Sequence, residues 1–180
     1  LDNSAGVDCS DHEVNIKVLL DGLVAAGAVS RDARDELLVE MTDDVEQLVL
    51  RQNYSQNELV GTCRAAAAGR FAVHTRQIRQ LEAKGALERD LEALPDDAEI
   101  ASRAARGVGL VSPELAVLIA HVKLDLKAAL LESTFLDSEF LRDRLTGYFP
   151  HALRTRHPEA ITAHPLRREI LATVLANEVV

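Results

Sequence analysis

The amino-acid sequence predicts an all-α fold, and three observations lead to that prediction. Apolar residues make up 47% of the 180-residue chain and are almost all Leu, Ala and Val, with no Trp, two Tyr and four Phe. Ala and Leu are strong helix formers, whereas strands favour aromatic and β-branched residues. Apolar positions recur every three or four residues, and no long stretch alternates with the period of two that marks a half-buried strand. We expect an irregular multi-helix bundle of about eight to ten helices.

The first half of the chain contains clear start and stop signals. Ser30 and Thr42 are suited to cap helix N-termini, while Gly27 and Gly85 are suited to end helices because glycine readily adopts a positive φ. The apolar pattern weakens over residues 52–55, which predicts a break there. We expect helices over residues 11–26, 30–39, 42–51, 57–68 and 71–84.

The second half has its clearest start signal at Ser112-Pro113-Glu114. This triplet offers a cap residue, a proline at the first helical position and an acid in the first turn. The helix that follows is the longest and most apolar, so we expect it to be the central core helix. Asp137 is predicted to cap a later helix that buries Phe140. We expect a short turn over 88–94, helices over 98–106, 113–131, 138–148 and from 165 onwards, and a looser segment over 151–164.

Charge and composition exclude several classes of function. The formal charge of −9 argues against a nucleic-acid-binding protein, because such proteins neutralise phosphates with Lys and Arg. Basic residues gather over 64–84 and 154–168, but acids interrupt or border both clusters, which indicates solvated or interdomain faces. Cys9 and Cys63 form no CxxC pair, which predicts a reduced, cytoplasmic protein. No signal peptide is recognisable, and the longest apolar run, 115–122, is far short of the roughly 20 residues that span a bilayer.

Most residues that could bind a metal, act as a nucleophile or bind phosphate are better explained by structural roles. No two of the six histidines have the i, i+4 spacing of a helical metal site, and no carboxylate completes a ligand set. Cys63 is typical of a small buried apolar group. Cys9 lies beside a predicted helix N-terminus but has no His partner. Gly107-Val108-Gly109 lacks the strand–helix context of a phosphate-binding loop, so we expect an ordinary loop.

The opening stretch, residues 3–15, has the strongest functional case. Asn3 offers an amide, Gly6 allows close approach of the backbone, and Ser10 presents a hydroxyl at a predicted helix N-terminus, where free N–H groups favour a carboxylate. Ser10 and Glu13 also have the spacing of a capping box. The alternative is a purely structural role, with Ser10 as a helix cap and Gly6 as a turn residue. The residues by themselves leave both interpretations open.

Residues 3–13, with the sequence NSAGVDCSDHE, resemble the N-x-G-G-V-x-x-S-x-x-E loop near the end of the catalytic core of glutamate dehydrogenases. The longer stretch 3–17 is similar to the large-subunit, NAD-specific bacterial class. Ala5 departs from the pattern, which has the first of two glycines there. Further resemblance to the C-terminal part of that class lies in LER and LPDD at 87–89 and 94–97, SPELAVL at 112–118, and HPLRREI at 164–170, continuing to Ala176-Asn177.

The resemblance implies a parent enzyme that uses NAD to convert L-glutamate into 2-oxoglutarate and ammonia. It implies that Asn3 lies near the cofactor, while Val7 and Ser10 line the substrate pocket and Ser10 meets the side-chain carboxylate. It also implies that residues 1–27 end an α/β dinucleotide-binding core and that 28–180 form a C-terminal helical domain. The family's catalytic lysine, catalytic aspartate and dinucleotide-binding glycines have no counterpart in these 180 residues. We therefore expect the chain alone to be inactive and not to bind NAD.

The chain starts at Leu1 within an organised motif, so we expect a piece of a longer polypeptide. Its expected partners are the rest of the glutamate dehydrogenase chain and further copies in a homo-oligomer, with no nucleic acid and no membrane. The helical remainder is expected to brace the catalytic core or mediate assembly rather than carry a regulatory site. The alternative is a free-standing helical interaction or regulatory module with no catalytic role.

Overall fold

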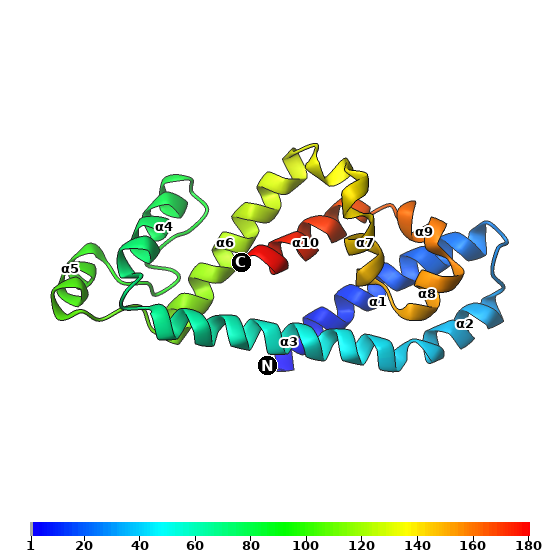
Figure 1. The fold of residues 1–180 in the computed structure, drawn as a ribbon, viewed down its shortest axis with the longest axis horizontal. Helices are drawn as coiled ribbons and strands as arrows, with labels where there is room; N and C mark the ends of the chain where they lie inside the picture. The colour runs from blue at the N-terminus through cyan, green and yellow to red at the C-terminus, as the bar shows by residue number, and fades with distance from the viewer. Residues whose placement is uncertain (1) are drawn as a thin grey trace. The chain divides into compact units, whose positions relative to one another are not determined.

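The computed structural model describes the backbone of residues 2–180 and the side chains of residues 6–180. Every regular element in this described part is helical, which confirms the all-α class (Figure 1). The helices are α1 (Asp2–Ala25), α2 (Arg31–Glu40), α3 (Thr42–Ala66), α4 (Phe71–Ala83), α5 (Asp97–Arg106), α6 (Ser112–Glu132), α7 (Arg142–Tyr148), α8 (His151–Arg156), α9 (Pro158–Thr162) and α10 (Arg167–Val179), with two 3₁₀ turns, η1 (Phe135–Asp137) and η2 (Glu139–Leu141).

The chain forms two compact units, each with its own apolar core. Unit 1 comprises residues 1–55 and 130–175, and unit 2 comprises residues 56–129 and 176–180. This division follows spatial contacts, whereas the domain boundary between residues 27 and 28 came from a family resemblance. That boundary stays a prediction.

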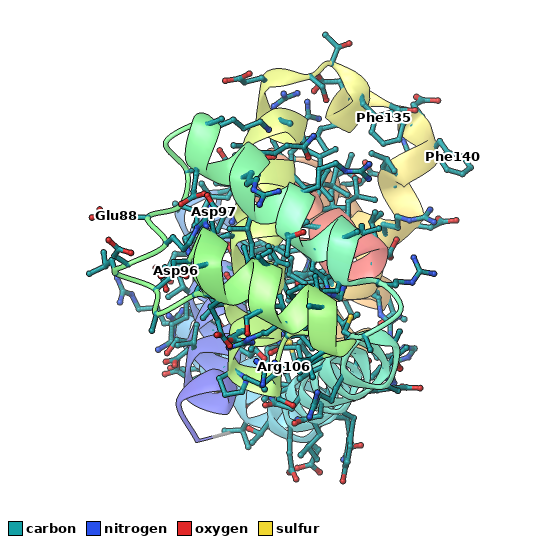
Figure 2. The ribbon with its side chains drawn as sticks, turned by 90° about the vertical axis from the view of Figure 1, so that its left-hand side faces the viewer. Glu88, Asp96, Asp97, Arg106, Phe135 and Phe140 are labelled. Carbon is teal, nitrogen blue, oxygen red and sulfur yellow. The ribbon has the colours of Figure 1, made fainter. Side chains whose placement is uncertain are left out.

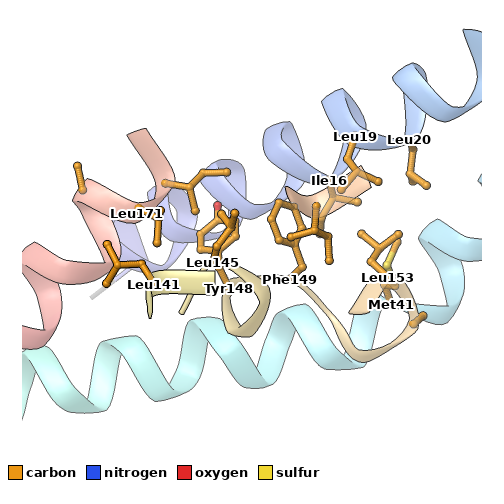
Figure 3. Close-up of a cluster of buried hydrophobic side chains, with 14 of the residues drawn as sticks. Ile16, Leu19, Leu20, Met41, Leu141, Leu145, Tyr148, Phe149, Leu153 and Leu171 are labelled. Carbon is orange, nitrogen blue, oxygen red and sulfur yellow. The ribbon is translucent and has the colours of Figure 1, made fainter. Parts of the chain in front are cut away.

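The core of unit 1 is built around Phe149, which is fully buried. One face of α1 supplies Ile16 and Leu20, and Leu153 comes from α8 (Figure 3). Met41, at the junction of α2 and α3, is 1% exposed and joins the same cluster. The 3–4 spacing of the apolar residues on α1 thus places a continuous stripe against this core.

The core of unit 2 centres on α4 and the start of α6. Phe71, Ile78 and Leu81 are buried on one face of α4, as the helical spacing predicts. Leu115 and Leu118 of α6 pack into the same cluster. Farther along α6, the apolar side chains are only half-buried, and Leu124 is 63% exposed. The prediction that this helix is central to the core is therefore correct only for its first turns.

Several helix ends follow the local signals. Ser30 Oγ accepts a hydrogen bond from the Ala33 N–H at 3.1 Å, so Ser30 is the predicted N-cap of α2. Gly27 follows α1 with φ of 71°, and Gly85 follows α4 with φ of 68°. Both positions require the left-handed conformation that glycine adopts without steric cost.

Two predictions of where helices run are wrong. α3 runs without interruption from Thr42 to Ala66, because the polar stretch 52–55 contains neither Gly nor Pro and its side chains lie on the helix surface. Conversely, the helix predicted from Asp137 is replaced by η1, η2 and the shorter α7. Phe140 is 74% exposed rather than buried, and Figure 2 shows it projecting outward with Phe135.

The segment 151–164, expected to be looser, contains α8 and α9. Pro158 stands at the first position of α9, where its missing N–H costs nothing. The short helical turn expected over 88–94 is a turn in which the Glu92 N–H donates to the Glu88 carbonyl at 3.1 Å, and Ala93 within it has φ of 51°.

Candidate functional site

The opening stretch is helical, and this corrects the predicted turn and capping box. α1 begins at Asp2, so Ser10 lies inside the helix and cannot cap its N-terminus. Glu13 instead pairs with Lys17, one turn onward. Once a helix is formed, each added residue gains a hydrogen bond, and no proline stops α1 from extending through Gly6. The free N–H groups invoked beside Ser10 are therefore used within the helix, and its hydroxyl is the group left for a ligand.

The three predicted site residues fall on one stripe of α1. Asn3, Val7 and Ser10 have i, i+4 and i+7 spacing, and on a helix of 3.6 residues per turn they lie within about 60° of arc. Val7 is 68% exposed, Val14 continues the stripe at 55%, and Ser10 is exposed. The side chain of Asn3 lies outside the described residues. Ile16 faces the opposite way, into the core of unit 1. The stripe thus points outward.

A polar network that is buried at Asn15 and Tyr148 ties this part of α1 to α7, and sequence reasoning missed it. Tyr148 Oη donates to Asp11 Oδ2 at 2.6 Å, and Asn15 Nδ2 donates to Tyr148 Oη at 2.9 Å. The same amide donates to the Asp11 carbonyl at 2.9 Å. Asn15 is 5% exposed and Tyr148 9% exposed. The available signal was Asn15 itself, a polar residue in the apolar stripe of a helix, since buried polar groups require partners.

His164 also holds α1 in place, through a hydrogen bond to its backbone. Its Nε2 donates to the Asn15 carbonyl oxygen at 3.0 Å, and its Nδ1 accepts from the Leu166 N–H at 3.0 Å. These partners select the neutral tautomer with the proton on Nε2. Burial lowers the pKa of His164 below its ordinary value. His12 stacks on the Tyr148 ring with centroids 4.4 Å apart, and burial lowers its pKa too, although Asp11 opposes that shift.

The stability of unit 1 is expected to fall as the pH drops below about 6.5. The unfolded chain takes up protons at His12 and His164 near pH 6.5, whereas the folded chain takes them up only at lower pH. Because the unfolded state binds more protons in that interval, the free energy of unfolding decreases with falling pH, by at most about 1.4 kcal/mol per pH unit for each histidine.

Urea unfolding at pH 7.5 and pH 5.5 measures this loss, and His164→Gln is the matched variant because an amide keeps a donor for the Asn15 carbonyl without titrating. The variant should lose less stability than the wild type between the two pH values. Equal losses in both proteins would contradict a role for His164 in the acid sensitivity.

The other family-like stretches hold helix ends and loops together. Arg168 donates to the carbonyls of Leu131 and Ser133, both at 2.9 Å, and to Asp137 at 2.5 Å. This long-range ion pair occupies the carboxylate of Asp137 that was expected to cap a helix. These contacts join the start of α10 to the end of α6 and to the segment that follows it.

In unit 2, the corresponding side chains are Arg89 and Glu114. Arg89 pairs with Glu82 and with Asp97, the latter at 3.1 Å, and the hydrogen bond with Glu82 raises its pKa. Glu114 accepts from the Val111 N–H at 2.8 Å and from Arg103 at 2.7 Å. The start of α6 is therefore capped by Glu114 reaching back, not by Ser112 as the sequence predicted.

A groove of about 650 Å³ lies between α1 and α3 in unit 1. Ile16, Met41, Val45 and Val49 give it apolar walls, and the exposed Cys9 also lines it.

Among the side chains that the structure describes, no group of three or more His, Cys, Asp or Glu is arranged to hold a metal ion. No helix in the described part of the chain is long and apolar enough to cross a membrane.

Fold and candidate residues together define a helical region whose first helix, α1, carries an exposed stripe that includes Val7 and Ser10. Residues 1–63 match the family model of the bacterial NAD-glutamate dehydrogenase catalytic domain, and residues 107–180 match that of the glutamate dehydrogenase C-terminal region. Over all 180 residues, the chain is 56% identical to the NAD-specific glutamate dehydrogenase of Mycobacterium tuberculosis, 45% to that of Pseudomonas aeruginosa and 39% to that of Halomonas elongata. The chain belongs to the bacterial NAD-specific glutamate dehydrogenase family. It spans 11% of the length of each of these relatives.

Proposed function

We propose that this chain is the C-terminal region of a large NAD-specific glutamate dehydrogenase, which converts L-glutamate, NAD and water into 2-oxoglutarate, ammonia and NADH. In this proposal, Val7 and Ser10 contribute to the substrate pocket and Asn3 lies on the cofactor side. The observation that carries the proposal is that Val7 and Ser10 lie on one exposed stripe of α1, with Asn3 one helical turn before Val7, within the part of the chain that matches the catalytic-domain model.

The chemistry assigned to these residues is binding and orientation. The Ser10 hydroxyl would donate a hydrogen bond to the side-chain carboxylate of glutamate, and Val7 would pack against its methylene carbons. NAD supplies the hydride acceptor when bound. The 180 residues contain no G-x-G-x-x-G turn of the kind that holds a dinucleotide pyrophosphate at a helix N-terminus. The remainder of the enzyme must therefore hold NAD.

The rest of the chain is proposed to brace α1 against the catalytic core and to support assembly into a homo-oligomer. Support for bracing comes from the contacts that reach α1 from far along the sequence. Tyr148 lies 137 residues after its partner Asp11, and His164 lies 149 residues after Asn15. Most of the polar contacts of the closing stretch likewise join helices rather than face an open pocket.

Replacing Ser10 by Ala in the full-length enzyme tests the assignment. Loss of a hydrogen bond to a charged carboxylate costs about 1.5–3 kcal/mol, so the KM for glutamate should rise roughly tenfold to a hundredfold. Ser55→Ala is the matched control, because Ser55 is also an exposed serine within a helix, α3. Its KM should equal that of the wild type.

The competing interpretation is a helical interaction module whose α1 stripe is only a surface. In that case Ser10→Ala would leave the KM for glutamate unchanged, as the control does. Such a result would remove Ser10 from the substrate pocket and would contradict the proposed role of the α1 stripe.

A further inference from the structure

We infer that Tyr148 is a positioning residue for glutamate binding, acting through Asp11 on the turn of α1 that carries Ser10. The inference rests on the proposed function, because it requires Ser10 to contact the substrate. It adds to the proposed substrate site a residue that lies outside the opening stretch and the family-like stretches. It also assigns α7, which carries Tyr148, a role in positioning α1.

The hydroxyl of Tyr148 is fixed in direction because it both donates and accepts. It donates to Asp11 Oδ2 at 2.6 Å and accepts from Asn15 Nδ2 at 2.9 Å. The Asn15 amide also reaches Asp11 Oδ1 at 3.3 Å, which closes a ring of three side chains. Hydrogen bonds depend on both distance and angle, so this ring restrains α1 more narrowly than apolar packing does.

The Tyr148 ring is itself held in place. His12 stacks on it with an interplanar angle of 25°, and the Phe149 ring meets it edge-on at 5.1 Å. Phe149 is fully buried in the core of unit 1 (Figure 3). The core therefore fixes the position of the phenol oxygen of Tyr148. The hydrogen bond from this oxygen then restrains Asp11.

Asp11 directly follows Ser10 and lies one turn from Val7, at the exposed edge of the stripe, whereas its partners Asn15 and Tyr148 are buried. Rotation of α1 about its own axis is the movement that this ring opposes. Since a helix with its side chains is about 10–12 Å wide, a rotation of about 10° moves a surface hydroxyl by about 1 Å. A misplacement of about 1 Å can reduce the rate of an enzyme by about a hundredfold. His164 adds a further restraint through the Asn15 carbonyl at 3.0 Å.

The test uses Tyr148→Phe in the full-length enzyme, with the KM and kcat for glutamate as readouts. Removing the hydroxyl should raise the KM for glutamate roughly three- to tenfold, less than the loss of Ser10 itself. Asp11→Ala should have the same effect, because it removes the acceptor of the Tyr148 hydroxyl at an exposed position of α1. Tyr54→Phe is the chemical control, since the Tyr54 side chain is 75% exposed. Ile170→Val is the stability control within the same core.

Combining Tyr148→Phe with Ser10→Ala separates positioning from general destabilisation. If Tyr148 acts by placing Ser10, the double variant should have the KM of Ser10→Ala alone, because coupled residues are not additive. An equal multiplication of KM in both backgrounds, or a rise in KM with Ile170→Val, would overturn the inference. So would an effect of Ser10→Ala without any effect of Tyr148→Phe and Asp11→Ala, and that result leaves the proposed function intact. No effect of Ser10→Ala would overturn both.

Discussion

Replacing Gly109 by Ala is expected to lower the free energy of unfolding of the 180-residue chain by about 3 kcal/mol, at the upper end of the range for overpacked sites. A Cβ at this position would lie 2.3 Å from the carbonyl carbon of Ala67, 2.5 Å from its oxygen and 2.6 Å from the Ala68 nitrogen. All three are backbone atoms in the turn that follows α3, so no side-chain rotation relieves the clash. Leu110, which follows, is fully buried, and its carbonyl accepts from Arg64 at 3.3 Å.

Gly61→Ala is the matched control for this prediction. Gly61 lies within α3, and a Cβ added there meets nothing within 4 Å. Ala in place of Gly inside a helix favours the helix by about 0.5–1 kcal/mol. Urea unfolding followed by circular dichroism should therefore show a lower midpoint for Gly109→Ala and an equal or higher midpoint for Gly61→Ala. Similar midpoints for the two variants would contradict the close approach at Gly109.

Local signals in the sequence predicted the all-α class and many helix ends. Ser30 caps α2, Gly27 and Gly85 follow their helices with positive φ, and the buried face of α4 is the one that its spacing indicates. These features depend on interactions within about one helical turn, so a single sequence contains the information that determines them. The same spacing overestimated how much of α6 is buried, because an apolar sequence does not determine which turns of a helix are covered by another element.

Interactions between residues that are far apart in the sequence could not be predicted from such local signals. Asp137 has the residue type of a cap, yet its carboxylate pairs with Arg168, and the expected helix becomes two 3₁₀ turns. The ring of Tyr148, Asp11 and Asn15 joins positions more than 130 residues apart. Only the presence of a polar residue on the apolar face of α1 hinted that such partners exist.

The opening stretch illustrates the limit most clearly. Its residue types and its family resemblance predicted a turn with Ser10 at the N-cap, whereas the structure has Ser10 within α1. The candidate residues nevertheless share one exposed stripe, because Val7 and Ser10 have helical spacing in the sequence. The roles of Asn3, Val7 and Ser10 stay predictions that kinetic measurements can test.

The isolated 180-residue chain is expected to form no NADH from L-glutamate and NAD, in contrast to the full-length enzyme. Hydride transfer requires NAD to be held against the substrate, and such positioning contributes about 7–11 kcal/mol to lowering a barrier. The described part of the chain offers an exposed stripe without a dinucleotide site, and the family's catalytic lysine and aspartate have no counterpart in the sequence. The whole positioning contribution is therefore absent, and the expected loss of activity is complete.

The most direct test is the rate of glutamate-dependent NADH formation, followed by absorbance, for the full-length enzyme and for the 180-residue chain at equal molar concentration. The account predicts glutamate-dependent reduction of NAD by the full-length enzyme and none by the chain, even at a large molar excess. Glutamate-dependent NADH formation by the isolated chain, or its absence in the full-length enzyme, would contradict it.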